Sequence, residues 1–380
     1  MKLLEKILWA DDFSAVSKDV ESMAKKISSL FDSTIIPMHV LPDDILDDNL
    51  RAHARKKVEE KLEAKVSRLR SEGIDVKDYL INFGSPYEGI VKAAIDTNAN
   101  IILVGAGNIP KSSKSRLGLT TFRIIQRSEK PVLVIAPGKS LDIKRILCPV
   151  DFSSASERAL RNAMTISRKF NAQLTVLGVC QADTPHWLYT PKDREEERQL
   201  RLKQHEKSFN TFLENFNLDD LDWQKLSTEG KPADEITRII EEQDTDLLIM
   251  GTAGRTGLER YFVGSVTEKV IRDVPTSFLT LKSEDVINLK IDTDITDLDT
   301  LYKTAVELSE NGYYEEAVMH FKDCLSISSM HIPAYFGIAD VYEKLKNKEK
   351  AEQYRKRGQE IKERMWYAKV EDEVRKLRHN

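Results

Sequence analysis

The chain of 380 residues lacks the cysteine pattern of a disulfide-built or zinc-binding protein. Its three cysteines, Cys148, Cys180 and Cys324, lie far apart and form no CxxC pair. This usage argues against a disulfide framework and a cysteine-ligated metal. It is typical of a reducing cytoplasm, where isolated thiols act as small buried apolar groups.

Long apolar runs and an excess of positive charge are also absent. No apolar run approaches the roughly 18 residues of a transmembrane helix. The net charge is −4, with 58 Lys and Arg against 62 Asp and Glu, so nucleic acid is not expected as a bulk partner. We therefore expect a cytoplasmic protein that binds neither membrane nor nucleic acid.

Catalytic signatures are missing as well. The sequence contains no GxxxxGK[ST] loop, no HExxH pair and no nucleophile elbow, and its seven histidines are scattered. No catalytic residue and no metal ligand is therefore assigned, which favours a binding module over an enzyme.

What the sequence does contain is a strand, a glycine loop and a helix start in residues 245–270. The apolar run 247–250 predicts a buried parallel strand, and it ends at Gly251. Glycines let a backbone approach a ligand, and the first N–H groups of the helix that begins near Gly264 would face an anion. The pattern predicts a phosphate cradle; the alternative is an ordinary strand-to-helix loop with turn glycines.

The detailed spacing carries a family resemblance. The spacing of the loop glycines resembles the nucleotide-binding signature of the universal stress protein family: two residues separate Gly251 from Gly254, and nine separate Gly254 from Gly264-Ser265. Upstream, residues 146–153 (ILCPVDFS) resemble the first strand and loop of that family. The resemblance implies an α/β fold of the adenine-nucleotide alpha-hydrolase-like kind, a parallel sheet, a role in stress response, and ATP as ligand, with Mg²⁺ on the triphosphate as an option.

The resemblance also implies roles for particular residues. Asp151 and Val179 would flank the adenine, Met250 and Gly251 would approach the ribose, and the loop glycines would surround the phosphates. For Asp151, capping of the following helix is the alternative. The implied nucleotide-binding residues are Pro149, Asp151, Val179, Met250, Gly251, Gly254, Gly264, Ser265, Val266 and Thr267.

An internal repeat organises the first three quarters of the chain. Alternating strand and helix patterns, one of them a strand at 76–81, predict a parallel sheet with helices on both faces. The order then repeats, which predicts two copies of one domain, 1–139 (the N-terminal copy) and 143–283 (the C-terminal copy). The offset is 139 residues for Asp12 and Asp151 and for Val40 and Val179, and it is 146 for Gly84 and Gly230, Gly105 and Gly251, and Gly118 and Gly264.

The short linker 137–140 predicts that the copies pair within one chain. In proteins resembling this family, domains pair through their final strands, which here are 131–135 and 275–281. The alternative, two separate domains, would leave apolar edge strands exposed.

The N-terminal copy departs from the nucleotide signature. Asn108, Leu119 and Ala10 stand where the C-terminal copy has Gly254, Ser265 and Pro149. Its loop carries Lys111, Lys114 and Arg116, so an anion could still bind there. We expect a degenerate site in this copy and one nucleotide per chain.

The remaining residues differ in kind. Residues 284–297 are acidic and β-branched and predict a linker, and 298–380 predict a helical domain. Ala317 and Ala351 are 34 residues apart, and this period, with NGYYEEA at the first turn, resembles tetratricopeptide repeats. A separate charged helix is predicted at 362–378. An unrelated pair of helical hairpins is the alternative.

Two classes of function follow. The first is an ATP-binding stress protein that acts as a regulatory or interaction module, with a protein partner at the helical tail and with homodimerisation as an option. The second is a slow ATP-hydrolysing or nucleotidyl-transferring enzyme; a nucleotide-independent scaffold is a third reading.

Overall fold

The computed structural model describes residues 4–42, 48–107, 117–138, 142–181, 191–252, 263–273, 275–282, 298–327 and 331–378. It divides into two compact units. The α/β unit contains 2–215 and 221–288, and the helical unit contains 216–220 and 289–380 together with residue 1.

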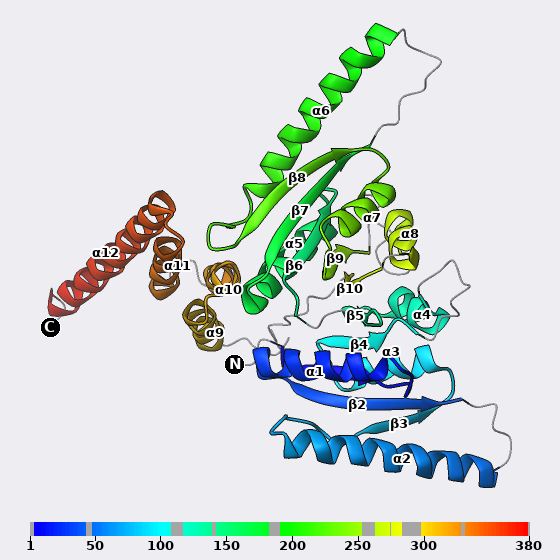
Figure 1. Ribbon diagram of the computed structural model, residues 1–380. Helices are drawn as coiled ribbons and strands as arrows, with labels where there is room; N and C mark the ends of the chain where they lie inside the picture. Colours follow the sequence, from blue (N-terminus) through cyan, green and yellow to red (C-terminus); the bar gives the residue numbers. More distant parts are fainter. Residues whose placement is uncertain are drawn as a thin grey trace. The chain divides into compact units, whose positions relative to one another are not determined.

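A single sheet forms the centre of the α/β unit (Figure 1). Across the described residues its strand order is β3-β2-β1-β4-β5-β10-β9-β6-β7-β8, so the second half mirrors the first. The strands are β1 (Lys6–Ala10), β2 (Thr34–Leu41), β3 (Leu80–Phe83), β4 (Ile101–Gly105), β5 (Val132–Ile135), β6 (Arg145–Val150), β7 (Gln173–Cys180), β8 (Trp223–Glu229), β9 (Leu247–Gly251) and β10 (Ser277–Leu281).

Helices return the chain from the end of each strand to the start of the next parallel one. The first four residues of the central strands β4 and β9 are buried, as expected for parallel strands covered on both faces. The helices of the N-terminal copy are α1 (Ser17–Phe31), α2 (Asp48–Ser71), α3 (Pro86–Asp96) and α4 (Leu119–Arg127), and those of the C-terminal copy are α5 (Ser154–Phe170), α6 (Pro191–Leu213), α7 (Pro232–Glu242) and α8 (Ser265–Asp273).

The two copies join through their last strands, which confirms the predicted pairing. β5 and β10 are antiparallel, with Leu133 opposite Leu279, whereas the other strand pairs of the described sheet are parallel. Antiparallel pairing of two equivalent strands places a pseudo-twofold axis at the seam. Neither copy therefore leaves its final apolar strand as a free edge.

A small apolar cavity next to this seam shows how closely the copies correspond. Its volume is about 20 Å³, and its lining residues fall into pairs at the two sequence offsets. One pair is unlike: Met23 of α1 is matched by Asn162 of α5. The lining pairs are Leu4 and Ile143, Met23 and Asn162, Ile27 and Ile166, Phe31 and Phe170, Ile101 and Leu247, and Leu133 and Leu279.

The predicted strand at 76–81 is shifted in the structure. Val76 forms only an isolated bridge with Ile35, and the ladder of β3 runs from Leu80 to Phe83. Between them, Arg70 of α2 donates to the Val76 carbonyl at 3.1 Å and to the Asp78 carboxylate at 2.8 Å. The Val76 carbonyl thus accepts from a side chain and not from a neighbouring strand, and the Asp78 side chain is 93% exposed.

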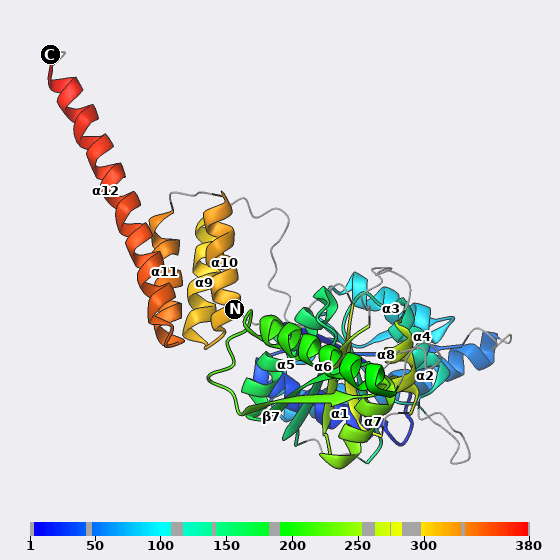
Figure 2. The same ribbon diagram turned by 90° about the horizontal axis from the view of Figure 1, so that it is seen from above.

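The helical unit consists, in its described part, of two antiparallel helix pairs (Figure 2). Its helices are α9 (Leu298–Glu310), α10 (Tyr314–Ile327), α11 (Ile332–Lys344) and α12 (Lys348–Arg378). Gly337 lets α11 come close to α10, because an added Cβ would lie 2.4 Å from the Phe321 ring.

The prediction of a separate helix at 362–378 is wrong. The segment continues the preceding helix, so that α12 runs from Lys348 to Arg378 and extends past α11 (Figure 2). The glycine at 358 does not end it. A Cβ there would lie 3.0 Å from Cβ of Tyr335, so this glycine serves close packing of α12 on α11.

Candidate functional site

The candidate site lies at the carboxyl end of β6 in the C-terminal copy. β6 pairs with β7 on one side and with β9 on the other, although β7 follows it directly in the chain. The connections on the two sides of β6 leave in opposite directions, which makes this a topological switch point, the usual ligand position in open α/β sheets. α5 and α8 both begin at this edge (Figure 1).

The turn from β6 into α5 fixes the Asp151 carboxylate. Its Oδ1 accepts from the Ser153 N–H at 3.1 Å and from the hydroxyls of Ser153 and Ser156, each at 2.5 Å. Ser153, not Asp151, is the N-cap of α5: its hydroxyl accepts from the Ser156 N–H. The helix cap is therefore supplied by Ser153, whereas Asp151 accepts the hydrogen bonds that hold the turn.

The loop from β9 to α8 is closed at its base by two bonds, next to a third that extends the pairing of β9 with β10. The Thr252 N–H donates to the Leu281 carbonyl at 2.8 Å, and the Gly264 N–H donates to the Thr252 carbonyl at 2.7 Å. The Thr267 hydroxyl donates to the Gly251 carbonyl at 3.0 Å. These bonds bring the start of α8 next to the end of β9.

Gly251 has a steric reason to be glycine. An added Cβ would lie 2.9 Å from the carbonyl oxygen of Ala155, in the first turn of α5. The end of β9 and the start of α5 therefore approach as closely as backbone allows, which draws the two loops of the switch point together.

The other predicted residues lie on the same strand ends and helix start. Pro149 and Met250 are buried, and Val179 and Val266 are partly buried against the core beneath α7 and α8. Ser265 is exposed at the first position of α8. Gly254 falls outside the described residues.

The N-terminal copy closes its corresponding loop in the same way. The Gly118 N–H donates to the Ala106 carbonyl at 2.7 Å, and the Thr121 hydroxyl donates to the Gly105 carbonyl at 3.0 Å, each bond 146 residues before its counterpart. The first helix position differs, however, because Leu119 is 64% exposed where Ser265 stands.

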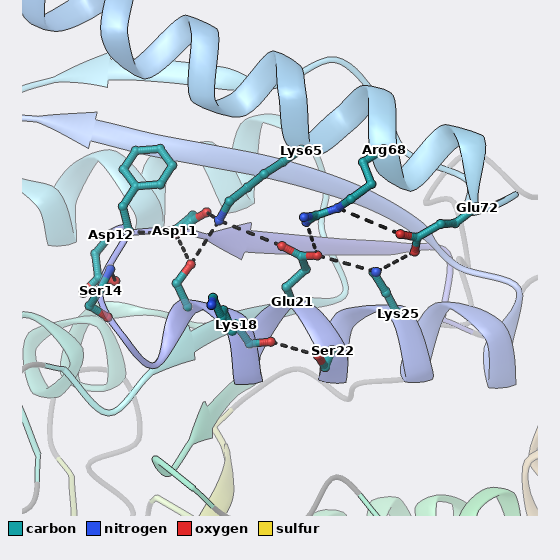
Figure 3. Close-up of polar contacts among 12 residues, drawn as sticks. Asp11, Asp12, Ser14, Lys18, Glu21, Ser22, Lys25, Lys65, Arg68 and Glu72 are labelled. Atoms are coloured by element: carbon teal, nitrogen blue, oxygen red, sulfur yellow. Dashed lines mark hydrogen bonds and ion pairs between the residues drawn. The ribbon is translucent and has the colours of Figure 1, made fainter.

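The strand-end turn of the N-terminal copy differs more deeply (Figure 3). The Ser17 hydroxyl, the counterpart of Ser156, donates to buried Asp11, and Lys65 of α2 donates to the same carboxylate. Asp12, the counterpart of Asp151, accepts from the Ser14 N–H at 3.0 Å. Sequence reasoning assigned no role to the serines, although the pattern Asp-Phe-Ser-x-x-Ser recurs in both copies and could have indicated one.

The described residues also bear on the metal and thiol expectations. They contain no group of three or more His, Cys, Asp or Glu side chains placed to hold a metal ion. All three cysteines are buried, as predicted, and burial raises the pKa of the Cys148 and Cys180 thiols. None of the helices in the described part is both long and apolar enough to cross a bilayer.

Comparison with known proteins decides the family. The model of the universal stress protein family matches residues 4–136 and again residues 142–282. The chain belongs to the universal stress protein family. A tetratricopeptide-repeat model matches residues 332–364, which include α11 and the first half of α12.

Individual universal stress proteins give the same result. Universal stress protein MJ0531 of Methanocaldococcus jannaschii is 31% identical over 156 residues, which cover 39% of this chain and 87% of that protein. A universal stress protein structure from Archaeoglobus fulgidus has a TM-score of 0.53 at 21% identity and covers 73% of this chain and 98% of its own. One from Pseudomonas aeruginosa has a TM-score of 0.56 at 18% identity, covering 75% and 95%. These two likenesses show the fold of the tandem α/β part.

Proposed function

We propose that this universal stress protein binds ATP in its C-terminal copy and acts as a nucleotide-responsive regulatory or interaction module in the stress response. The observation that carries the proposal is the closed base of the β9–α8 loop, where Gly264 and Thr267 bond back to Thr252 and Gly251. This closure sets the N-terminus of α8 beside the switch point. The helix dipole there contributes about 0.3–1 kcal/mol toward each interacting negative charge, and charge-assisted N–H bonds to phosphate add to it.

The remaining residues fit a nucleoside triphosphate. Val179 and Met250 supply apolar surface for a base and a ribose, and Asp151 supplies an acceptor. Mg²⁺ would be held mainly by the triphosphate itself and by water, as it usually is in nucleotide sites.

Calorimetry on the intact chain tests the proposal. We expect one ATP per chain, because the N-terminal copy has Asn108, Leu119 and Ala10 where the C-terminal copy has Gly254, Ser265 and Pro149. The double substitution Gly254→Asn with Ser265→Leu should weaken binding by more than about a hundredfold, since it removes a charge-assisted bond and adds bulk. Leu119→Ser is the matched control and should leave the stoichiometry at one. Two equivalent sites, or binding that survives the double substitution, would contradict the assignment.

The helical unit is proposed as the partner-binding part. A groove of about 780 Å³ lies between α9 and α11, with Tyr302, Phe321 and Phe336 on its apolar wall and Asp340 at its rim. Its size suits a peptide segment of another protein or of a second copy. Proteins captured from stressed cells by the full chain should be lost with Asp340→Lys and should change when ATP is added. Sedimentation of the wild-type chain and of the Asp340→Lys variant shows whether the captured protein is a second copy of the chain.

A further inference from the structure

The Asp151 carboxylate is held by more donors than a turn requires. Three of them converge on one oxygen, Oδ1, and two of the three are the hydroxyls of Ser153 and Ser156. Hydrogen bonds on one carboxylate oxygen fix the rotation of the whole group. The other oxygen, Oδ2, thereby acquires a defined direction at the end of β6.

Ser156 is the stronger of the two constraints. It is 6% exposed in the first turn of α5, and its hydroxyl both donates to Asp151 Oδ1 at 2.5 Å and accepts from the Asp151 N–H at 3.0 Å. These two hydrogen bonds tie the backbone and the side chain of Asp151 to α5. Ser153 adds its bond from the N-cap position.

The N-terminal copy shows what happens when the serine is drawn elsewhere. Ser17 occupies the position of Ser156, 139 residues earlier, yet its hydroxyl donates to Asp11. Asp11 stands where the C-terminal copy has Val150, a side chain that accepts no hydrogen bond. Ser17 thus bonds Asp11, and Ser156 bonds Asp151. Only Asp151 is the carboxylate that the family resemblance implies to flank a base.

We propose that Ser156, supported by Ser153, is a positioning residue that sets base preference by aiming the Asp151 carboxylate at the 6-amino group of adenine. This inference rests on the proposed function. A carboxylate accepts hydrogen bonds and donates none. Adenine presents an amino donor at its 6-position, whereas hypoxanthine and guanine present an oxygen acceptor there. A carboxylate that cannot rotate away therefore accepts from adenine and repels the 6-oxo bases.

The experiment compares ATP with inosine triphosphate, which replaces the 6-amino group by an oxygen, on the full-length protein. Wild-type protein should prefer ATP by roughly ten- to a hundredfold, the range of one well-made base contact. Ser156→Ala should cut this preference by about tenfold, because the carboxylate gains rotational freedom. Ser156→Thr retains the hydroxyl and should restore the preference.

Ser17→Ala is the matched control. It removes a similarly buried serine from the aligned position of the N-terminal copy, where the hydroxyl bonds Asp11, so the preference for ATP should not change. Ser153→Ala provides a second reading at a less buried position and should lower the preference in the same direction. It also keeps the test decisive if Ser156→Ala does not fold, as judged by circular dichroism.

The outcomes separate the inference from the proposed function. Wild-type protein that binds neither nucleotide overturns both. An ATP preference that survives Ser156→Ala and Ser153→Ala, or a loss of affinity that is equal for the two nucleotides, overturns only the positioning role. A preference that falls in both serine variants and not in Ser17→Ala supports it.

Discussion

The two copies of the repeat hold their second helix against the sheet by different chemistry. In the N-terminal copy, α2 adds charges there to its buried apolar residues: Lys65 contacts Asp11, and Arg68 contacts Glu21 (Figure 3). In the C-terminal copy, α6 places a ring there: the ring centroid of Phe209 lies 5.5 Å from that of Phe152. Ion pairs join α6 to the sheet elsewhere, as between Arg198 and Glu229 of β8. The same fold thus accommodates an ion pair in one copy and a pair of aromatic rings in the other at this point.

Two strand positions account for this difference. Gly178 of β7 leaves room for the Phe209 ring, which would lie 2.8 Å from an added Cβ, whereas its counterpart on β2 is His39. At the end of the first strand, Val150 corresponds to Asp11. With Val150 at this position, the strand end offers no second carboxylate that competes with Asp151 for the Ser156 hydroxyl, and so the copy with the ring contact is also the one whose Asp151 accepts from that hydroxyl.

Removing the central ring should have the largest effect on stability. Phe209 is fully buried, so Phe209→Ala should cost about 3–5 kcal/mol through lost burial and a cavity. Urea unfolding gives the midpoint shift, and hydrogen exchange locates it: β7 and β8 should lose protection before β2 and β3. Phe13→Ala, a partly exposed ring in the N-terminal copy, is the control and should cost less. Equal loss of protection in both copies would show that the interface is not local to one of them.

Breaking the ion pair of the N-terminal copy should come next. The Asp11 side chain is 0% exposed and that of Lys65 is 21% exposed. Lys65→Met should therefore cost about 2–3 kcal/mol, somewhat less than the loss of a fully buried partner. Asp11→Val combined with Lys65→Met imitates the apolar solution of the other copy and should recover most of the loss. A double variant no more stable than Lys65→Met would mean that the charges are not coupled.

The seam between the copies offers a pH-dependent test. Lys282, just after β10, is buried and donates to the Gln126 carbonyl of α4, whereas its counterpart 146 residues earlier is Ala136. Burial lowers the pKa of Lys282 from 10.5 to about 8. Between these two values the unfolded chain keeps a proton that the folded chain has released, so stability from this group rises with pH across that window and is lowest below it.

Lys282→Met should remove this contribution. Relative to the variant, wild-type protein should gain about 1–3 kcal/mol between pH 8 and pH 10 in urea unfolding. Taking the difference cancels the other titrating groups. A difference that is flat with pH would show that the ammonium of Lys282 is well compensated by its carbonyl partner.

Sequence reasoning succeeded where a signal is local or recurs at a fixed offset. The buried strand ending at Gly251 needed only an apolar run, and the pairing of β5 with β10 followed from the repeat together with the family resemblance. It failed where a residue distant in the sequence determines the local structure. The start of β3 was misplaced because Arg70 of α2 bonds the Val76 carbonyl. The Asp11–Lys65 pair was missed because its residues are 54 positions apart and no local pattern connects them. The continuity of α12 was missed because the helix was taken to end with the repeat pattern at Glu360, although no breaker follows there.

The smallest expected effect concerns the serine that precedes each first helix. In the C-terminal copy, Ser153 caps α5, and its side chain accepts from the Ser156 N–H. In the N-terminal copy, the N-cap of α1 is Val16 and has no side-chain cap bond, although Ser14 corresponds to Ser153. Ser153→Ala should therefore cost about 1 kcal/mol, the usual value of a lost cap, and Ser14→Ala should cost nearly nothing. Each variant removes one serine hydroxyl from the aligned position of one copy, so their urea midpoints can be compared. Equal costs for the two variants would contradict the prediction, because only Ser153 makes a cap bond. The difference between the two strand-end turns would then lie in their carboxylates, Asp151 and Asp11.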